Sequence, residues 1–147
     1  MINLQNKKPK ILVIGDLMID HYLWGSCERI SPEAPVQVID IESESIVLGG
    51  AGNVVNNLYT LGANVDIISV IGECETSKEL EELLAAIKVS TSFLVHQKDR
   101  VTSKKSRIIA DQQQVVRYDR ENTNEISNES QDAIIQNFKS LINNYDL

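Results

Sequence analysis

The 147-residue sequence has little cysteine and histidine, with only two of each. Cys27 and Cys74 form no CxxC pair, and the histidines have no cysteine or histidine close by, so the spacing of a structural zinc site is missing. No apolar run approaches the ~18 residues needed to span a membrane, and the chain does not start with a charged segment followed by an apolar one. These absences predict a reduced, cytoplasmic protein.

Positive charge is also scarce. The chain has 14 Lys and Arg residues against 21 Asp and Glu residues, a formal net charge of −7. Phosphate backbones and anionic lipids do not attract such a protein, which argues against general nucleic-acid binding and against a membrane-surface patch. With 42% hydrophobic residues, the chain is long enough to form one domain with a buried core.

Glycine is concentrated where an extended stretch gives way to a helical pattern, in the run Gly49-Gly50-Ala51-Gly52-Asn53. Gly49 and Gly50 can adopt backbone angles closed to other residues and let a ligand approach the main chain. A helix that begins near Asn53 directs free N–H groups and its positive dipole end toward this turn. A tight connection between strand and helix, with no ligand, explains the glycines equally well.

A short apolar run at 10–16 ends in glycine and aspartate, which predicts a buried strand. Ligands bind at the carboxyl ends of strands in open parallel sheets. Asp16 lies at that end and Asp20 follows four residues later, so both carboxylates could face one cleft and hold the hydroxyls of a polyol. Alternatively, Asp16 caps the next segment and Asp20 is solvated.

The rest of the chain alternates between helical and strand patterns. Strands are expected at 65–72 and 92–95, and helices after the glycine turn, at 76–87 behind a Thr76–Glu79 capping box, and from Ser127 or Asn128 onward. This order predicts an α/β fold with a mostly parallel sheet flanked by helices. The first helix is expected to bury an apolar stripe of Val54, Val55, Leu58 and Leu61, with Gly62 ending it, and the last to present Ile134, Ile135, Phe138, Leu141 and Ile142 on one side.

Two insertions break this pattern. Alternating residues at 22–25 and 36–41 predict antiparallel strands, and 104–109 with 115–119 predicts a second hairpin. Together they suggest a lid, or an arm for oligomer formation. Lys105 and Arg107 share one strand face, which suits an anionic ligand, although exposed solubilising charge explains the spacing as well.

Common catalytic motifs are missing. A dinucleotide-binding fingerprint does not fit, because Val55 occupies the third glycine position and the glycines follow the first insertion instead of the first strand. GxxxxGK[ST], GxSxG and HExxH are all absent from the sequence. What remains is a binding half-site with two acids, a glycine turn, Asn53 and a lid.

The order of these parts resembles the N-terminal half of the ribokinase-like (PfkB) carbohydrate kinases. The resemblance rests on Asp16-x-x-x-Asp20, the glycine turn, Leu61-Gly62-Ala63 and a strand that ends Val70-Ile71-Gly72. Within this family, 13–22, 29–36 and 113–117 most resemble the subgroup that phosphorylates D-glycero-β-D-manno-heptose 7-phosphate. The resemblance implies a ribokinase-like domain at 10–147 that is incomplete, with lid segments at about 22–48 and 103–119 and a flexible N-terminus at 1–9.

The resemblance also implies roles for individual residues. The sugar-contacting positions of the family match Asp16, Asp20, Gly49, Gly50 and Asn53. Lys105 and Arg107 match a lid pair that would hold the 7-phosphate or shape the cleft. Glu33, Gln114 and Arg117 lie in matching segments, where a structural role is an equal alternative.

The family's domain normally runs to roughly twice this length. Its Gly-Ala-Gly-Asp motif, which carries the general base, and its site for Mg²⁺ and ATP are expected outside these residues, so no catalytic residue is assigned and the chain alone is expected not to turn over ATP. A homodimer is expected, through the lid strands or an exposed sheet edge. Two alternatives are a non-catalytic dimerisation module and a kinase of the same family with another sugar specificity.

Overall fold

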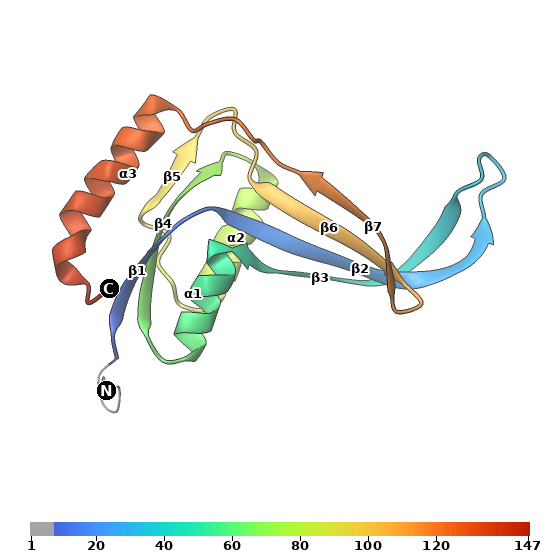
Figure 1. The fold of residues 1–147 in the computed structure, drawn as a ribbon, viewed down its shortest axis with the longest axis horizontal. Coiled ribbons are helices and arrows are strands. Elements are labelled where there is room, and N and C mark those ends of the chain that lie inside the picture. The colour runs from blue at the N-terminus through green and yellow to red at the C-terminus, as the bar shows by residue number, and fades with distance from the viewer. Residues whose placement is uncertain (1–7) are drawn as a thin grey trace.

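Two sheets organise the computed structural model, which describes residues 8–147 (Figure 1). The first is a parallel sheet of three strands in the order β1-β4-β5. It consists of β1 (Lys10–Ile14), β4 (Asn64–Gly72) and β5 (Leu94–Gln97). The flexible N-terminus expected at 1–9 lies largely outside the described residues, and the carbonyl of Pro9 accepts a hydrogen bond from the backbone N–H of Asn64.

Three helices flank the parallel sheet, as expected from the sequence. They are α1 (Ala51–Thr60), α2 (Glu75–Ala86) and α3 (Asn128–Leu141), and the 3₁₀ helix η1 (Ile142–Asn144) follows the last. Helix α3 packs on one face against β4 and β5, and α1 and α2 lie on the other (Figure 1). No helix within 8–147 is both long and apolar enough to cross a membrane.

The core lies between the central strand β4 and the two helices α1 and α2. Ile67, Ile71, Leu80 and Leu84 are at most 1% exposed, and Val55 joins them from α1. Because β4 is covered on both faces, its consecutive residues Ile67, Ile68 and Ser69 are all buried, instead of every second residue.

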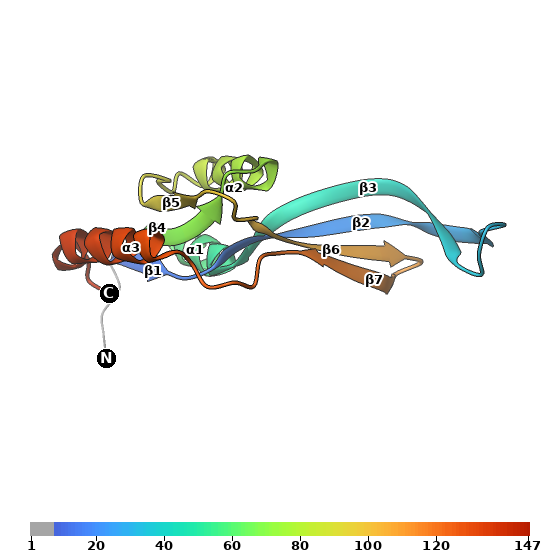
Figure 2. The ribbon, with the colours of Figure 1, turned by 90° about the horizontal axis from the view of Figure 1, so that it is seen from above.

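The second sheet has four strands in the order β3-β2-β6-β7 and projects from the parallel sheet as a long, narrow arm (Figure 2). Strands β2 (Leu17–Ile30) and β3 (Gln37–Gly50) are much longer than the strands expected at 22–25 and 36–41. Strand β2 pairs in parallel with β6 (Ser103–Ala110), which forms a hairpin with β7 (Gln113–Arg120). Both expected hairpins therefore lie in one sheet.

Three local expectations were wrong. The first strand ends at Ile14, which is 48% exposed, so β1 is only partly buried. In α1, Val54 and Leu61 are exposed, whereas Gly52 and Val55 are buried. A Cβ at Gly52 would lie 3.0 Å from Cβ of Leu48, so this glycine lets the helix pack closely on the end of β3.

The third wrong expectation is the capping box of α2. Cys74 is the N-cap residue and makes no side-chain capping bond, so Thr76 lies inside the helix. The neighbouring Ser77 hydroxyl instead donates to the carbonyl of Gly72, 2.5 Å away. The last helix begins as expected, because Ser127 Oγ accepts from the backbone N–H of Ser130. Its expected apolar side is only partly covered, and Ile135, Phe138 and Ile142 are exposed.

Two glycines with positive φ allow a matched test of the glycine turn. Gly50 has φ +57°, and a Cβ there would lie 2.5 Å from the Asp16 carbonyl oxygen, whereas Gly62 has φ +90° with nothing within 4 Å. We expect Gly62→Ala to lower the free energy of unfolding by about 1–2 kcal/mol through backbone strain. Gly50→Ala should cost clearly more, because a clash with backbone adds to strain of about 1–3 kcal/mol. Urea unfolding of both variants measures the difference, and equal losses would contradict the close packing at Gly50.

Candidate functional site

The glycine turn lies beside the start of β2. Strand β2 begins directly after Asp16, and β3 ends at Gly50, so Leu17 pairs with Gly50 and Met18 with Gly49. The backbone N–H of Ala51 donates to the Asp16 carbonyl at 2.9 Å. A Cβ at Gly49 would lie 2.5 Å from Oδ2 of Asp20. Glycine at this position therefore leaves the space that the Asp20 carboxylate occupies.

Charged side chains from three strands gather on one face of the four-stranded sheet. In the register, Asp20 of β2 lies opposite Lys105 of β6, which lies opposite Asp119 of β7. We call this surface the charged face and define it by Asp20, Tyr22, Lys105, Arg107, Arg117, Asp119 and Glu121.

Asp20 and Arg107 form the closest ion pair of the charged face. Arg107 Nη1 donates to Asp20 Oδ1 at 2.6 Å, and each side chain is 21% exposed. The Arg107 guanidinium also lies 5.3 Å from the centre of the Tyr22 ring, a cation–π distance. Arg107 therefore contacts both Asp20 and the ring of Tyr22.

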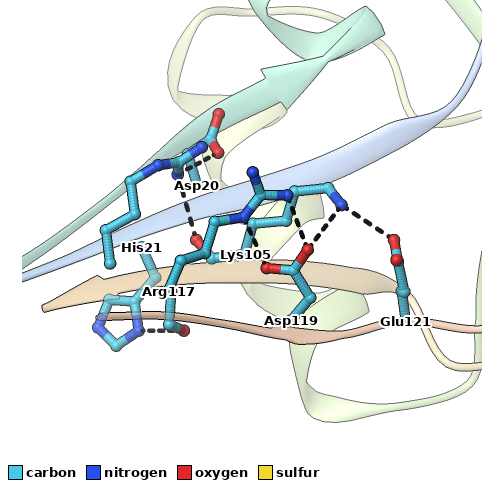
Figure 3. A network of polar contacts seen from close by, with 8 residues as sticks. Asp20, His21, Lys105, Arg117, Asp119 and Glu121 are labelled. Atoms are coloured by element: carbon cyan, nitrogen blue, oxygen red, sulfur yellow. Dashed lines mark hydrogen bonds and ion pairs between the residues drawn. The ribbon is translucent and has the colours of Figure 1, made fainter. Parts of the chain in front are cut away.

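Lys105 and Arg117 share the carboxylate of Asp119 (Figure 3). Lys105 Nζ lies 3.2 Å from Asp119 Oδ2 and 3.0 Å from Glu121 Oε2. Arg117 grips Asp119 with both Nε, at 2.9 Å, and Nη2, at 2.7 Å. The hydrogen bonds from Arg117, followed by those from Lys105, lower the pKa of Asp119 to about 2. The hydrogen bond to Glu121 raises the pKa of Lys105, with Asp119 adding to it.

Within residues 8–147, no hydrogen bond or ion pair joins the side chains of Asp16 and Asn53 to this network. Asp16 is exposed and lines a cavity of about 130 Å³ with Met18, Arg100, Thr102, Ser103, Glu121 and Asn122 among others. Asn53 is exposed on the first turn of α1. Of the residues predicted from the sequence, the structure brings Asp20, Gly49, Lys105 and Arg107 together. Asp16 and Gly50 lie at the base of the same strands.

The opposite face of the sheet is held by a buried histidine. His21 is 8% exposed, and its Nδ1 and Nε2 lie 3.2 Å from Ser106 Oγ and 3.0 Å from Glu44 Oε2. Lys104, on the same side of β6, forms a 2.8 Å ion pair with Glu79 of α2. These contacts join β3, β2 and β6 and tie the sheet to the helical layer. The sheet that carries the charged face is therefore held in place by contacts on its opposite face.

Tyr22, Asp119 and Glu121 belong to the charged face but were not predicted as site residues. Tyr22 lies two residues after Asp20 on a strand, and this spacing could have placed it on the same face. Asp119 could not have been placed opposite Lys105 by counting from the hairpin turn, because the ladder shifts by one residue between Ile108 and Ile109.

Metal ligands do not gather in the described part of the chain. Among residues 8–147, no group of three or more His, Cys, Asp and Glu side chains could hold a metal ion. The described residues therefore present no such set of ligands to a Mg²⁺ ion.

The Asp119 network gives a prediction for its own titration. Its carboxyl should titrate near pH 2 in the wild type. Because Arg117 is the main cause, Arg117→Gln should move the pKa up toward the ordinary value of about 3.9. Since the folded-state pKa is depressed, the stabilisation is present above about pH 3.9 and is lost as the pH falls toward 2. Carbon-detected NMR of the side-chain carboxyls measures both values. Arg120→Gln is the control, and an unchanged Asp119 pKa in Arg117→Gln would refute the assignment.

Comparison with known proteins agrees with this architecture. The chain is 63% identical over 140 residues to the "Bifunctional protein HldE" of Aliarcobacter butzleri. The matched region covers 95% of this chain and 29% of the relative. It is 57% identical over 143 residues to the protein of the same name from Sulfurimonas denitrificans, covering 97% and 30%. The chain thus spans about 30% of the length of the curated relatives it matches.

A solved structure with a similar fold is the nucleoside kinase of Methanocaldococcus jannaschii, described as an archaeal member of the ribokinase family. The TM-score is 0.57 at 20% identity, over 76% of this chain and 36% of that chain, so the likeness concerns the fold. Residues 8–146 match the family model described as pfkB family carbohydrate kinase. With this match over almost its whole length, the chain belongs to the pfkB family of carbohydrate kinases.

Proposed function

We propose that this chain forms the sugar-binding part of an ATP-dependent kinase that phosphorylates the anomeric hydroxyl of D-glycero-β-D-manno-heptose 7-phosphate. The product would be the 1,7-bisphosphate, an intermediate on the way to ADP-heptose for lipopolysaccharide. The observation that carries the proposal is the charged face, where Asp20 lies against Gly49 of the glycine turn and shares one face of the sheet with three cations. The specificity for heptose rests on the sequence resemblance described above.

The charged face and the residues around the glycine turn suit different parts of a sugar phosphate. A carboxylate only accepts hydrogen bonds, so Asp16 and Asp20 suit hydroxyl groups. Lys105 and Arg107, on one face of β6, suit the phosphate of the substrate. Gly49 leaves room for the Asp20 carboxylate and Gly50 for the Asp16 carbonyl, so both glycines let these groups lie close to the main chain. Asn53 presents an amide at the start of α1.

The contribution of such a site to catalysis is alignment. Phosphoryl transfer depends on positioning and on stabilising charge, so a sugar held by fixed carboxylates presents one oxygen to the phosphoryl donor. The general base and the site for ATP and Mg²⁺ are expected in the remaining part of the kinase domain. For this reason binding, and not turnover, is the suitable measurement for this chain.

Calorimetric titration tests the acceptor site directly. We expect the chain to bind D-glycero-D-manno-heptose 7-phosphate in preference to ribose and fructose 1-phosphate. Asp16→Asn should weaken binding about tenfold or more, because a charge-assisted hydrogen bond contributes about 1.5–3 kcal/mol. Asp16 is exposed, so the variant should fold normally.

Asp132→Asn is the matched control, since it removes one exposed carboxylate from α3, away from the charged face. If the folded wild type binds none of the three sugars, the proposed acceptor site is wrong. A non-catalytic dimerisation module would also give that result. Preference for ribose or fructose 1-phosphate would instead indicate another specificity within the family.

A homodimer is part of the proposal. Strands β3 and β7 are the outer strands of the four-stranded sheet, and each has one unpaired edge. Apolar side chains are exposed on β7, with Val115 at 41%, Val116 at 44% and Tyr118 at 51%.

The proposed compartment is the cytoplasm. Both cysteines are free, as in a reducing cytoplasm, where a sugar phosphate would be available.

Light scattering tests the dimer. We expect a dimer for the wild type and a shift toward monomer in Tyr118→Lys, because a charge on the exposed face of β7 opposes its burial. Tyr59→Lys, at an exposed position on α1, is the control and should leave the mass unchanged. A monodisperse monomer of the wild type at high concentration would contradict the dimer.

A further inference from the structure

The charged face is electrically balanced without a ligand. Its cations are Lys105, Arg107 and Arg117, and its carboxylates are Asp20, Asp119 and Glu121. Every cation already has a carboxylate partner within 3.2 Å. A phosphate dianion that entered this face would add two negative charges to a neutral set. The charged face therefore does not contain a pair of unpaired cations that could bind an anion without displacing a carboxylate.

Asp119 is the carboxylate shared between two cations. Its Oδ2 lies 2.7 Å from Arg117 Nη2 and 3.2 Å from Lys105 Nζ. Glu121, by contrast, contacts only Lys105 among these cations, and Asp20 lies against the glycine turn, paired with Arg107. Asp119 therefore occupies the position from which one anion reaches both Lys105 and Arg117, as Figure 3 shows.

We propose that Asp119 is an internal competitor of the substrate phosphate, which must release Lys105 or Arg117 when a phosphate binds and thereby sets the affinity of the site for phosphorylated sugars. This inference rests on the proposed function, and it adds a residue that opposes binding. The binding free energy of a phosphate is then only the difference between the free energy of its own contacts with the cations and that of the Asp119 contacts it replaces.

Protonation does not relieve the competition. With a pKa of about 2, Asp119 remains ionised throughout the physiological range. Movement is the available route, and the place of Asp119 in the fold permits it. Strand β7 is an outer strand, and all of its eight residues are exposed. The carboxylate can therefore turn into water without crossing the core.

Lys105 and Arg117 differ in their need for a counter-ion. The Lys105 side chain is 16% exposed, against 44% for Arg117. A partly buried ammonium needs a nearby anion more than an exposed guanidinium does. A phosphate can replace Asp119 beside Lys105, and Glu121 remains near that cation in both states. An unphosphorylated sugar cannot make this exchange and leaves the Asp119 contacts intact.

Asp119→Asn keeps the shape of the side chain and removes its charge. We expect the variant to bind inorganic phosphate and D-glycero-D-manno-heptose 7-phosphate about five- to tenfold more tightly than the wild type, the size expected for one partly screened charge at contact distance. Affinity for the unphosphorylated heptose should not change. Calorimetry gives all three affinities, and NMR titration follows inorganic phosphate where binding is weak.

Asp111→Asn is the matched control, because it removes one exposed carboxylate from the turn between β6 and β7 and tests the effect of net charge alone. Equal or weaker phosphate binding by Asp119→Asn would overturn the inference and would mean that Asp119 positions the cations. The same gain in Asp111→Asn would overturn it too. Inorganic phosphate is used as the probe because its binding tests the competition without requiring the sugar site. Failure of the wild type to bind heptose 7-phosphate would instead count against the proposed function.

Discussion

The pairing of strand β2 on both of its edges is the constraint on which the rest of the structure depends. β2 follows β1 after only Gly15 and Asp16, and it bonds antiparallel to β3 and parallel to β6. Because side chains alternate along a strand, this pairing places Leu17, Ile19 and His21 on the buried face. Asp20 and Tyr22 then lie on the other. A shift of one residue would exchange the two sets, burying Asp20 and exposing Ile19.

The same constraint explains why the site combines rigidity with charge. The buried face supports the sheet through the core and through His21, which contacts side chains of both neighbouring strands. The charged face can then carry charged side chains, which would be costly to bury in a core. Its carboxylates and cations satisfy one another across three strands, so that half-buried side chains such as Lys105 and Arg107 are paired in the absence of a ligand. Under the proposed competition, an incoming anion has to displace one of these carboxylates.

Close packing at the glycine turn joins the two sheets. Gly50 ends β3, caps α1 and approaches the Asp16 carbonyl, while Gly52 brings α1 against Leu48 and Leu17. The residues that hold the fold together here are neighbours of those that would hold a sugar. Loss of the turn would therefore disturb the position of Asp16 as well as the packing of α1.

Much of the α/β framework was predictable, because it depends on short-range patterns. The apolar runs of β1 and β4, the helix that starts after Ser127 and the glycine turn all follow from residues within a few positions of one another. The positions of Asp16, Asp20, Lys105 and Arg107 as candidates also followed from local motifs and from the family resemblance. The buried side of α1 and the cap of α2 were not predictable in this way, because both depend on contacts between different elements. Gly52 of α1 packs against Leu48 of β3, and Ser77 of α2 donates a hydrogen bond to the carbonyl of Gly72 in β4.

The sequence by itself determined the type and order of the helices and strands, since periodicity and turn chemistry are properties of neighbouring residues. Only the tertiary structure decided which charges meet. The parallel pairing of β2 with β6 joins Asp20 to Arg107 across 87 residues, and the irregularity near Ile108 brings Asp119 opposite Lys105. Pairing between distant strands depends on the register of the whole sheet, and a single displaced residue reverses the face of every side chain that follows.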